Sequence, residues 1–181
     1  MKRLLAAFVG FVLLAGPAYG GGSQPSGNTG DRKFDSTLER INVAAQADPD
    51  GFIRQLSSRY ITPEQEIRQT RETYGLGGAD LYMATAIARA TGRPVLSVAE
   101  EHGKNQGKGW GVIAQEMGIK PGSSAFHALK KGAQGSLDHM QSAAKERQKH
   151  ERELKKEQER QKKKESQGKG KGQGQGQDKP R

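Results

Sequence analysis

Proline and glycine divide residues 35–136 into short segments, and this punctuation limits the fold more than any other feature of the sequence. The dipeptides Asp48-Pro49 and Thr62-Pro63 each end one apolar pattern and begin another, as expected at a helix N-terminus. Before the first of these dipeptides, apolar residues such as Leu38 and Ile41 recur every three or four positions, which is typical of one helix face. No run alternates apolar and polar residues as a strand would. We predict an all-α fold, a compact array of short helices.

The boundaries of the first helices follow from the same signals. The first helix is predicted to begin near Asp35 or Ser36, either of which can act as an N-cap. Gln65 stands where a capping box places Glu or Gln, so a helix is expected after Pro63. Gly75 is expected to end that helix.

Two later segments resemble each other at an offset of 26 residues. Residues 87–92 (IARATG) align with residues 113–118 (IAQEMG), and each copy ends in a glycine followed two or three residues later by proline. Such a glycine can adopt the left-handed C-cap, so both segments are predicted to form helix-turn-helix-like hairpins. This pattern leaves a nucleic-acid-binding function as an alternative. Specific DNA binding is disfavoured because the second copy inserts Lys120-Pro121-Gly122 into its turn.

The two ends of the chain differ in composition from its middle. Residues 1–20 combine Lys2 and Arg3 with an apolar run and small residues before Gly20, and are predicted to be a cleaved signal peptide. The protein is therefore expected to be exported, either to the periplasm or as a secreted protein. Residues 21–34 are predicted to be a flexible linker and residues 35–136 the helical domain. Residues 137–165 are expected to form a charged, solvated helix, and residues 166–181 a disordered tail.

Charge is concentrated in the last part of the chain. Residues 31–136 hold 14 basic and 12 acidic side chains, whereas residues 137–181 hold 14 basic and 8 acidic ones. A basic tail of this kind attracts anionic polymers and lipid headgroups. The predicted partners are an unidentified protein or an anionic envelope component, with possible contact of the tail to an anionic lipid or polymer. A purely solubilising tail remains the alternative.

No arrangement typical of an enzyme or a metal site is present. The chain has no cysteine, and its four histidines lie far apart without a paired-ligand spacing. We predict no catalytic residue, no metal site and no cofactor. The single tryptophan, Trp110, is expected either to anchor the core or to offer an aromatic face to a ligand. The candidate partner-binding residues are Trp110, His127, Lys120, Lys130 and Lys131, and an enzyme with a site near Trp110 and His127 is the less favoured alternative.

Residues 107–132 carry the succession GWGxIA, GIKPGS and FHxLK. This string resembles a group of uncharacterised exported bacterial proteins, and the likeness extends over residues 74–132. The resemblance implies an exported helical domain and brings no known activity, cofactor or site residue. The function predicted from the sequence is that of an exported, non-enzymatic interaction module with a basic tail for electrostatic attachment.

Overall fold

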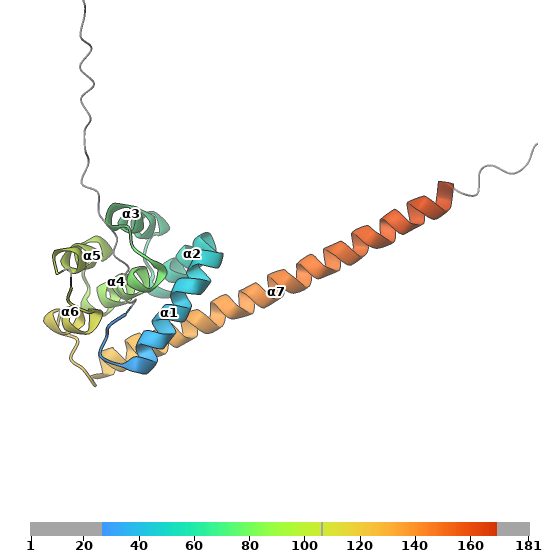
Figure 1. The fold of residues 1–181 in the computed structure, drawn as a ribbon. Helices are drawn as coiled ribbons and strands as arrows, with labels where there is room; N and C mark the ends of the chain where they lie inside the picture. The colour runs from blue at the N-terminus through green and yellow to red at the C-terminus, as the bar shows by residue number, and fades with distance from the viewer. Residues whose placement is uncertain (1–26, 106, 170–181) are drawn as a thin grey trace, which may run out of the picture.

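The computed structural model of the protein describes residues 27–105 and 107–169, and every regular element within them is an α-helix (Figure 1). The predicted all-α fold is confirmed. In chain order the helices are α1 (Arg32–Ala47), α2 (Pro49–Tyr60), α3 (Glu64–Tyr74), α4 (Gly78–Thr91), α5 (Val95–Lys104), α6 (Trp110–Glu116) and α7 (Ser124–Lys169). We call residues 27–144 the body and residues 145–169, the part of α7 that extends away from it, the arm.

Helix α4 lies at the centre of the body. All its residues from Ala79 to Ala88 except Asp80 are buried, and α1, α2, α3, α5 and α7 all contact it. A helix that is apolar on every side is stable only in such a position. Close approach is possible because α4 begins with Gly78, where a Cβ atom would lie 2.5 Å from the Cβ of Ala45 in α1.

The predicted helix starts are partly confirmed. The carboxylate of Asp48 accepts a hydrogen bond from the backbone N–H of Gly51 (3.0 Å) and caps α2, as the Asp48-Pro49 signal indicated. The first helix, however, begins earlier than predicted. Its N-cap is Asp31, which accepts from two backbone N–H groups at 3.0 Å, while Asp35 lies inside the first turn. The prediction of Asp35 or Ser36 as the cap was wrong because Asp31 occupies that position.

The boundary of the flexible linker is also corrected. Residues 21–26 lie outside the described part of the chain, but residues 27–34 pack against the body. The backbone carbonyls of Gly27 and Asn28 accept hydrogen bonds from the N–H groups of Trp110 (3.3 Å) and Gly111 (3.4 Å). A Cβ atom at Gly111 would lie 2.3 Å from the carbonyl oxygen of Thr29. Glycine in the first turn of α6 therefore lets the N-terminal segment dock.

Of the two predicted hairpins, the first forms as a pair of helices that pack against each other. Helices α4 and α5 pack together across Gly92, which has the left-handed conformation (φ 70°) that the C-cap prediction requires. Gly118 likewise has a positive φ (93°) after α6. Helix α6, however, contacts chiefly α5, whereas α7 packs on α1, α4 and α2. The second segment has the predicted glycine with positive φ, but its two helices, α6 and α7, pack mainly on other helices and do not form a hairpin.

The predicted division at residue 137 falls inside α7. Leu137 and Met140 are buried and belong to the core, so the domain continues past residue 136. The boundary was misplaced because composition changes at Leu137 while the buried face of the helix persists for about one further turn, to Met140. The backbone of α7 is helical through Lys169, and the predicted disordered tail of residues 166–181 stays a prediction. Residues 170–181, like the predicted signal peptide, lie outside the described residues.

Candidate functional site

The arm is a single exposed helix. Every side chain from Lys145 to Lys164 is exposed, including Leu154 at 45%. The helix continues for 25 residues beyond the body, which corresponds to about 37 Å. Figure 1 shows the arm running outward from the body as the last part of α7. Beyond the ion pair of Arg147 with Asp48 at the root of the arm, its exposed side chains through Lys164 are accessible to other molecules.

The root of the arm is fixed to α2. Arg147 forms an ion pair with Asp48, the residue that caps α2. The hydrogen bond from Gly51 and the Arg147 guanidinium hold the pKa of the Asp48 carboxyl below its usual value, despite an opposing effect of burial. Beside this pair lies a groove of about 360 Å³, lined by small residues such as Ala44 and Ala144. The arm therefore leaves the body in a defined direction.

Six basic residues of the arm lie on one face. At 3.6 residues per turn, spacings of four and three residues place all six within an arc of about 80° around the helix axis. Within residues 145–164, that arc contains no acidic side chain and no other residue. We call this set the basic stripe: Lys145, Lys149, Arg152, Lys156, Arg160 and Lys163.

Acidic residues flank the stripe instead of interrupting it. Glu146, Glu153 and Glu157 form a row on one side of it, Glu159 borders its other side, and Glu151 lies on the back of the helix. Glu151 pairs with Lys155 at 2.8 Å, and that hydrogen bond lowers the pKa of the Glu151 carboxyl. Pairs of this type support an exposed helix.

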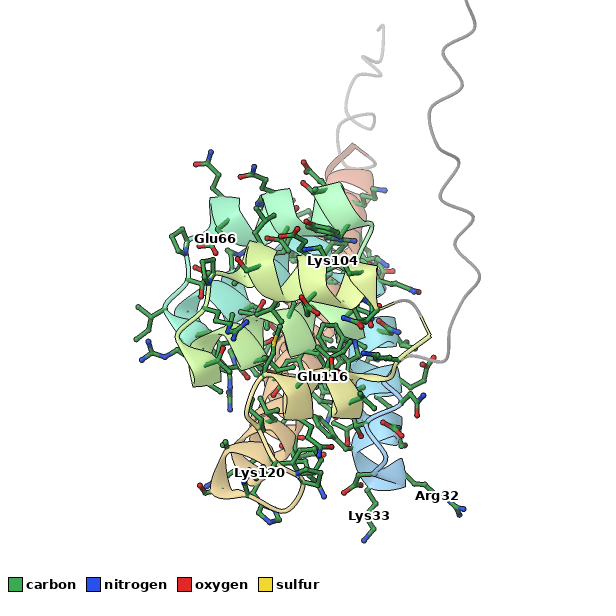
Figure 2. The ribbon with its side chains drawn as sticks, turned by 90° about the vertical axis from the view of Figure 1, so that its left-hand side faces the viewer. Arg32, Lys33, Glu66, Lys104, Glu116 and Lys120 are labelled. Carbon is green, nitrogen blue, oxygen red and sulfur yellow. The ribbon has the colours of Figure 1, made fainter. Side chains whose placement is uncertain are left out.

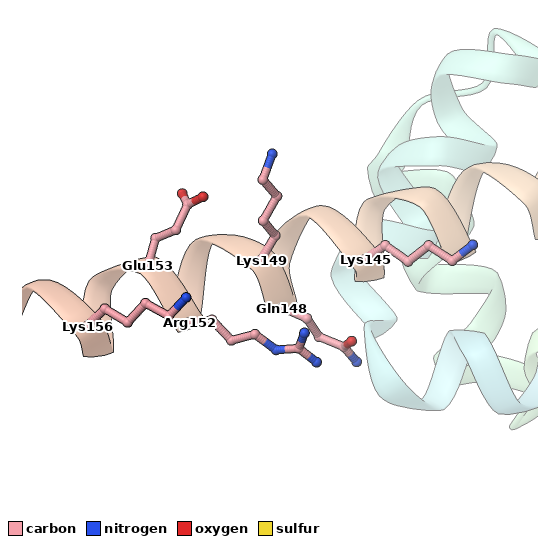
Figure 3. Close-up of a pocket in the computed structure, with 6 residues that line it drawn as sticks. All are labelled: Lys145, Gln148, Lys149, Arg152, Glu153 and Lys156. Carbon is pink, nitrogen blue, oxygen red and sulfur yellow. The ribbon is translucent and has the colours of Figure 1, made fainter.

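The side chains of Figure 3 belong to the first half of the stripe and its borders. They surround a hollow of about 360 Å³, and all of them come from one stretch of α7. No second element closes this space, so it is the surface between the side chains of one helix and does not enclose a small molecule. The chemistry of the arm is that of a charged surface.

The structure places Trp110 in the core, which corrects its inclusion among the partner-binding candidates. The indole is 2% exposed, and its Nε1–H donates to the Asp80 carboxylate at 2.8 Å. One face of the ring is covered by the His102 imidazole, with centroids 4.3 Å apart and planes 6° from parallel. No face of the indole is left for a ligand. The alternative that Trp110 anchors the core is confirmed.

His102 and Asp80 form a cluster with Trp110 that the sequence did not indicate. Burial lowers the pKa of His102, because an imidazolium stacked on Trp110 loses hydration, and the Asp80 carboxylate only partly opposes this effect. The three residues lie on α5, α4 and α6. No sequence signal links them, since each is separated from the next by at least eight positions and belongs to a different helix.

Lys130 is engaged inside the body. Its ammonium pairs with Asp31, the N-cap of α1, and this contact is the largest cause of the lowered pKa of the Asp31 carboxyl. The pair joins α7 to the start of α1, and the Asp31 carboxylate balances the positive charge of Lys130. Lys130 therefore has a structural role, and its place among the partner-binding candidates is not supported by its contacts.

The remaining candidates are exposed. His127 and Lys131 stand four residues apart on the outer face of α7, and Lys120 lies in the preceding turn. Figure 2 shows Lys120 at the same end of the body as Arg32 and Lys33. His127 and the buried Trp110 share no accessible surface, so the geometry gives no support to an enzyme site built from both.

The helix-turn-helix alternative gains no support from the exposed face of α5. That face carries Leu96, Ser97 and Glu100, and Glu100 pairs with Lys104 at 2.8 Å. A helix that enters a DNA groove needs donors for phosphates and bases. Here the start of α5 is instead occupied by the body, since Glu66 of α3 accepts a hydrogen bond from the Val95 N–H at 3.0 Å (Figure 2).

Within residues 27–105 and 107–169, no three His, Asp or Glu side chains gather closely enough to hold a metal ion. None of the helices in this part of the chain combines the length and apolar character needed to cross a bilayer. No protein-family model, curated protein or solved structure matches the chain. The surface chemistry of the arm is therefore the feature from which function is argued.

Proposed function

We propose that the protein is an exported, non-enzymatic attachment module, in which the arm holds the body to an anionic component of the cell envelope. The observation that carries the proposal is the exposed arm. Residues 145–164 hold ten basic and five acidic side chains, all of them outside the core. A cationic rod projecting from a body is suited to long-range attraction of an anionic surface or polymer. Export rests on the signal-peptide pattern of residues 1–20.

Charge substitution in the complete protein tests the attachment. In an arm-neutral variant, the six residues of the basic stripe are changed to glutamine. A body-neutral variant loses the same charge from six exposed residues of the body by the same change: Arg32, Lys33, Arg40, Arg89, Arg93 and Lys120. Both variants have the same net charge, so a difference between them reports on location.

We measure binding of each variant to isolated cell-envelope material at about 0.01 M and about 0.15 M salt. The wild-type and body-neutral proteins are expected to bind at low salt and to dissociate as salt is added, whereas the arm-neutral variant is expected to bind several-fold more weakly. Equal binding of the arm-neutral and body-neutral variants would contradict attachment through the arm.

Export is tested separately by expressing the full chain in a bacterium. We expect the protein outside the cytoplasm with a mass that corresponds to cleavage near Gly20. Retention of the uncleaved chain in the cytoplasm would contradict this part of the proposal, and the arm would then have to meet its partner there.

A further inference from the structure

We propose that the basic stripe is a binding surface for one flexible phosphodiester chain laid along the arm. This inference rests on the proposed function and specifies its partner. The partner is a linear polymer with one negative charge per repeat, contacted through its phosphates. The stripe runs from Lys145 to Lys163, a span of 18 residues or about 27 Å.

The first argument is charge spacing. The stripe presents roughly one cation per helical turn, or one per 5.4 Å along the axis. A stacked nucleic-acid strand carries one charge per 3.4 Å, and a duplex about one per 1.7 Å. An unstacked single chain spreads its charges farther apart than either, so its repeat is the closest to that of the stripe. A flexible chain can also adjust its repeat to the alternating spacings of four and three residues.

The second argument is side-chain type. Four of the six stripe residues are lysines, and a lysine ammonium is a compact charge with rotatable donors that suits phosphate oxygens. Planar carboxylates are matched best by the forked guanidinium of arginine, which only Arg152 and Arg160 provide. Residues 145–169 contain no Phe, Tyr or Trp on which a base could stack, so recognition depends on the backbone of the polymer.

The third argument distinguishes a polymer from a membrane. A helix that lies on a bilayer buries an apolar face, and the arm has Leu154 as its single large apolar residue. Glu153 and Glu157 border the stripe and would be drawn close to a flat anionic surface together with it. A narrow chain can contact the stripe while leaving those carboxylates in water. The geometry therefore favours a linear partner.

The experiment uses two exchanges of residues that conserve composition. In R152E/E157R, a cation leaves the middle of the stripe and reappears beside it. In the control E157K/K164E, position 157 also becomes basic, but the cation is taken from Lys164, which lies off the stripe. Both exchanges create a new pair of Glu153 with a basic residue at position 157, four residues later on the helix. Pairs at this spacing stabilise a helix, so the arm is expected to stay helical in both variants. Circular dichroism verifies this.

The probe is an oligothymidylate of about twenty nucleotides, long enough to follow the whole stripe. Fluorescence anisotropy with the full-length protein measures its affinity at about 0.05 M salt. We expect R152E/E157R to bind about fivefold or more weakly than the wild type and E157K/K164E to bind within about twofold of it. Raising salt to about 0.2 M should weaken wild-type binding on the order of a hundredfold. Polyglutamate and vesicles of phosphatidylglycerol in phosphatidylcholine are expected to bind several-fold more weakly than the oligonucleotide.

Each contrary result overturns the inference in a recognisable way. Equal affinity of the two exchange variants for the oligonucleotide would mean that binding depends on the total charge of the arm and not on the arrangement of the stripe. Vesicles that bind as tightly as the oligonucleotide identify a membrane as the partner, and polyglutamate that does so removes the preference for phosphate. All three results leave the proposed attachment intact. That proposal fails separately, if the arm-neutral variant binds envelope material as well as its body-neutral counterpart.

Discussion

The two halves of α7 belong to one continuous helix, yet different forces hold them in that conformation. In the first half, Leu137 is 1% exposed and Lys130 pairs with α1. In the arm, no residue through Lys164 is buried. Arg147 at its root pairs with Asp48, and farther out the helix has local pairs such as Glu151 with Lys155. Because such pairs are individually weak, the arm depends on intrinsic helix propensity. An unbroken helix can thus join a packed element to an exposed surface.

The largest expected difference between the halves comes from truncating one leucine in each. Leu137→Ala removes a fully buried side chain and is expected to lower the free energy of unfolding by about 2–5 kcal/mol. Leu154→Ala, at a half-exposed position in the arm, is expected to change it by less than about 0.5 kcal/mol. Chemical denaturation measures both. A comparable loss in the two variants would show that the arm packs against something in solution.

A smaller effect is expected from adding one methyl group to the first half of α7. At Gly132, a Cβ atom would lie 2.7 Å from the Tyr82 hydroxyl and 2.9 Å from that of Tyr60. The Tyr82 hydroxyl donates to the Leu129 carbonyl at 2.6 Å and is not free to move. Gly132→Ala should therefore destabilise the body by about 1–2 kcal/mol, even though alanine is the better helix former.

The matched change in the arm is Gln158→Ala, which meets no other element. Thermal unfolding is expected to give the wild-type Tm within about one degree, because surface substitutions of this kind have effects near zero. If Gly132→Ala instead raised the Tm, helix propensity would outweigh contact with the two tyrosines, and the first half of α7 would resemble the arm.

Acid is expected to weaken the body before it affects the ion pairs. The pKa of His102 is lowered in the folded protein, so the unfolded chain binds the additional proton as pH falls below about 6.5. Stability should be complete above that pH and decline below it. Asp31 and Asp48 have lowered pKa values, so their contribution is lost only at more acidic pH, below about 4.

Denaturation midpoints at pH 7, 6 and 5 measure this dependence on the wild type and on His102→Gln. The variant should be less stable at pH 7, because it loses the stacked ring, but its stability should change less between pH 7 and 5. An unchanged pH dependence would remove His102 as the cause. The helical signal of the arm serves as an internal comparison, since His102 lies outside it.

The smallest effect concerns a pair in the arm. Glu151→Gln removes the carboxylate that binds Lys155, and should reduce the helical circular dichroism signal slightly without changing the Tm of the body. Hydrogen exchange should also distinguish the arm from the body, because the backbone amides of residues 145–169 are expected to exchange far faster than those of α4. A fall in Tm on Glu151→Gln would mean that arm and body unfold together.

Sequence patterns predicted the elements of this fold better than its contacts. Asp48, Gly75 and Gly92 mark helix boundaries where they were expected, because caps depend on residues close in the chain. The contacts of Asp31 with Lys130 and of Asp80 with Trp110 join residues 99 and 30 positions apart, and no local signal encodes them. Trp110 could be expected in the core, but its two polar neighbours could not be identified.

The candidate surface was foreseen only in outline. The excess of positive charge after residue 136 is a property of composition and was visible at once. Its organisation into a stripe depends on one fact, that the helix stays unbroken from Ser124 into the arm and so keeps a constant register. The sequence boundary placed at residue 137 hid this continuity.

Contacts between residues far apart in the chain also determine the order in which the body can fold. Asp31 pairs with Lys130 and Asp48 with Arg147, each partner lying 99 residues later in the chain, and residues 27–28 dock on Trp110 and Gly111 at the start of α6. The contacts of α1, α2 and α4 with α7 cannot form while the ribosome still holds α7, whereas the contacts among α1 to α5 do not depend on it. Such non-local closure slows folding. The contacts with α7 are therefore the last part of the core to form as the chain leaves the ribosome.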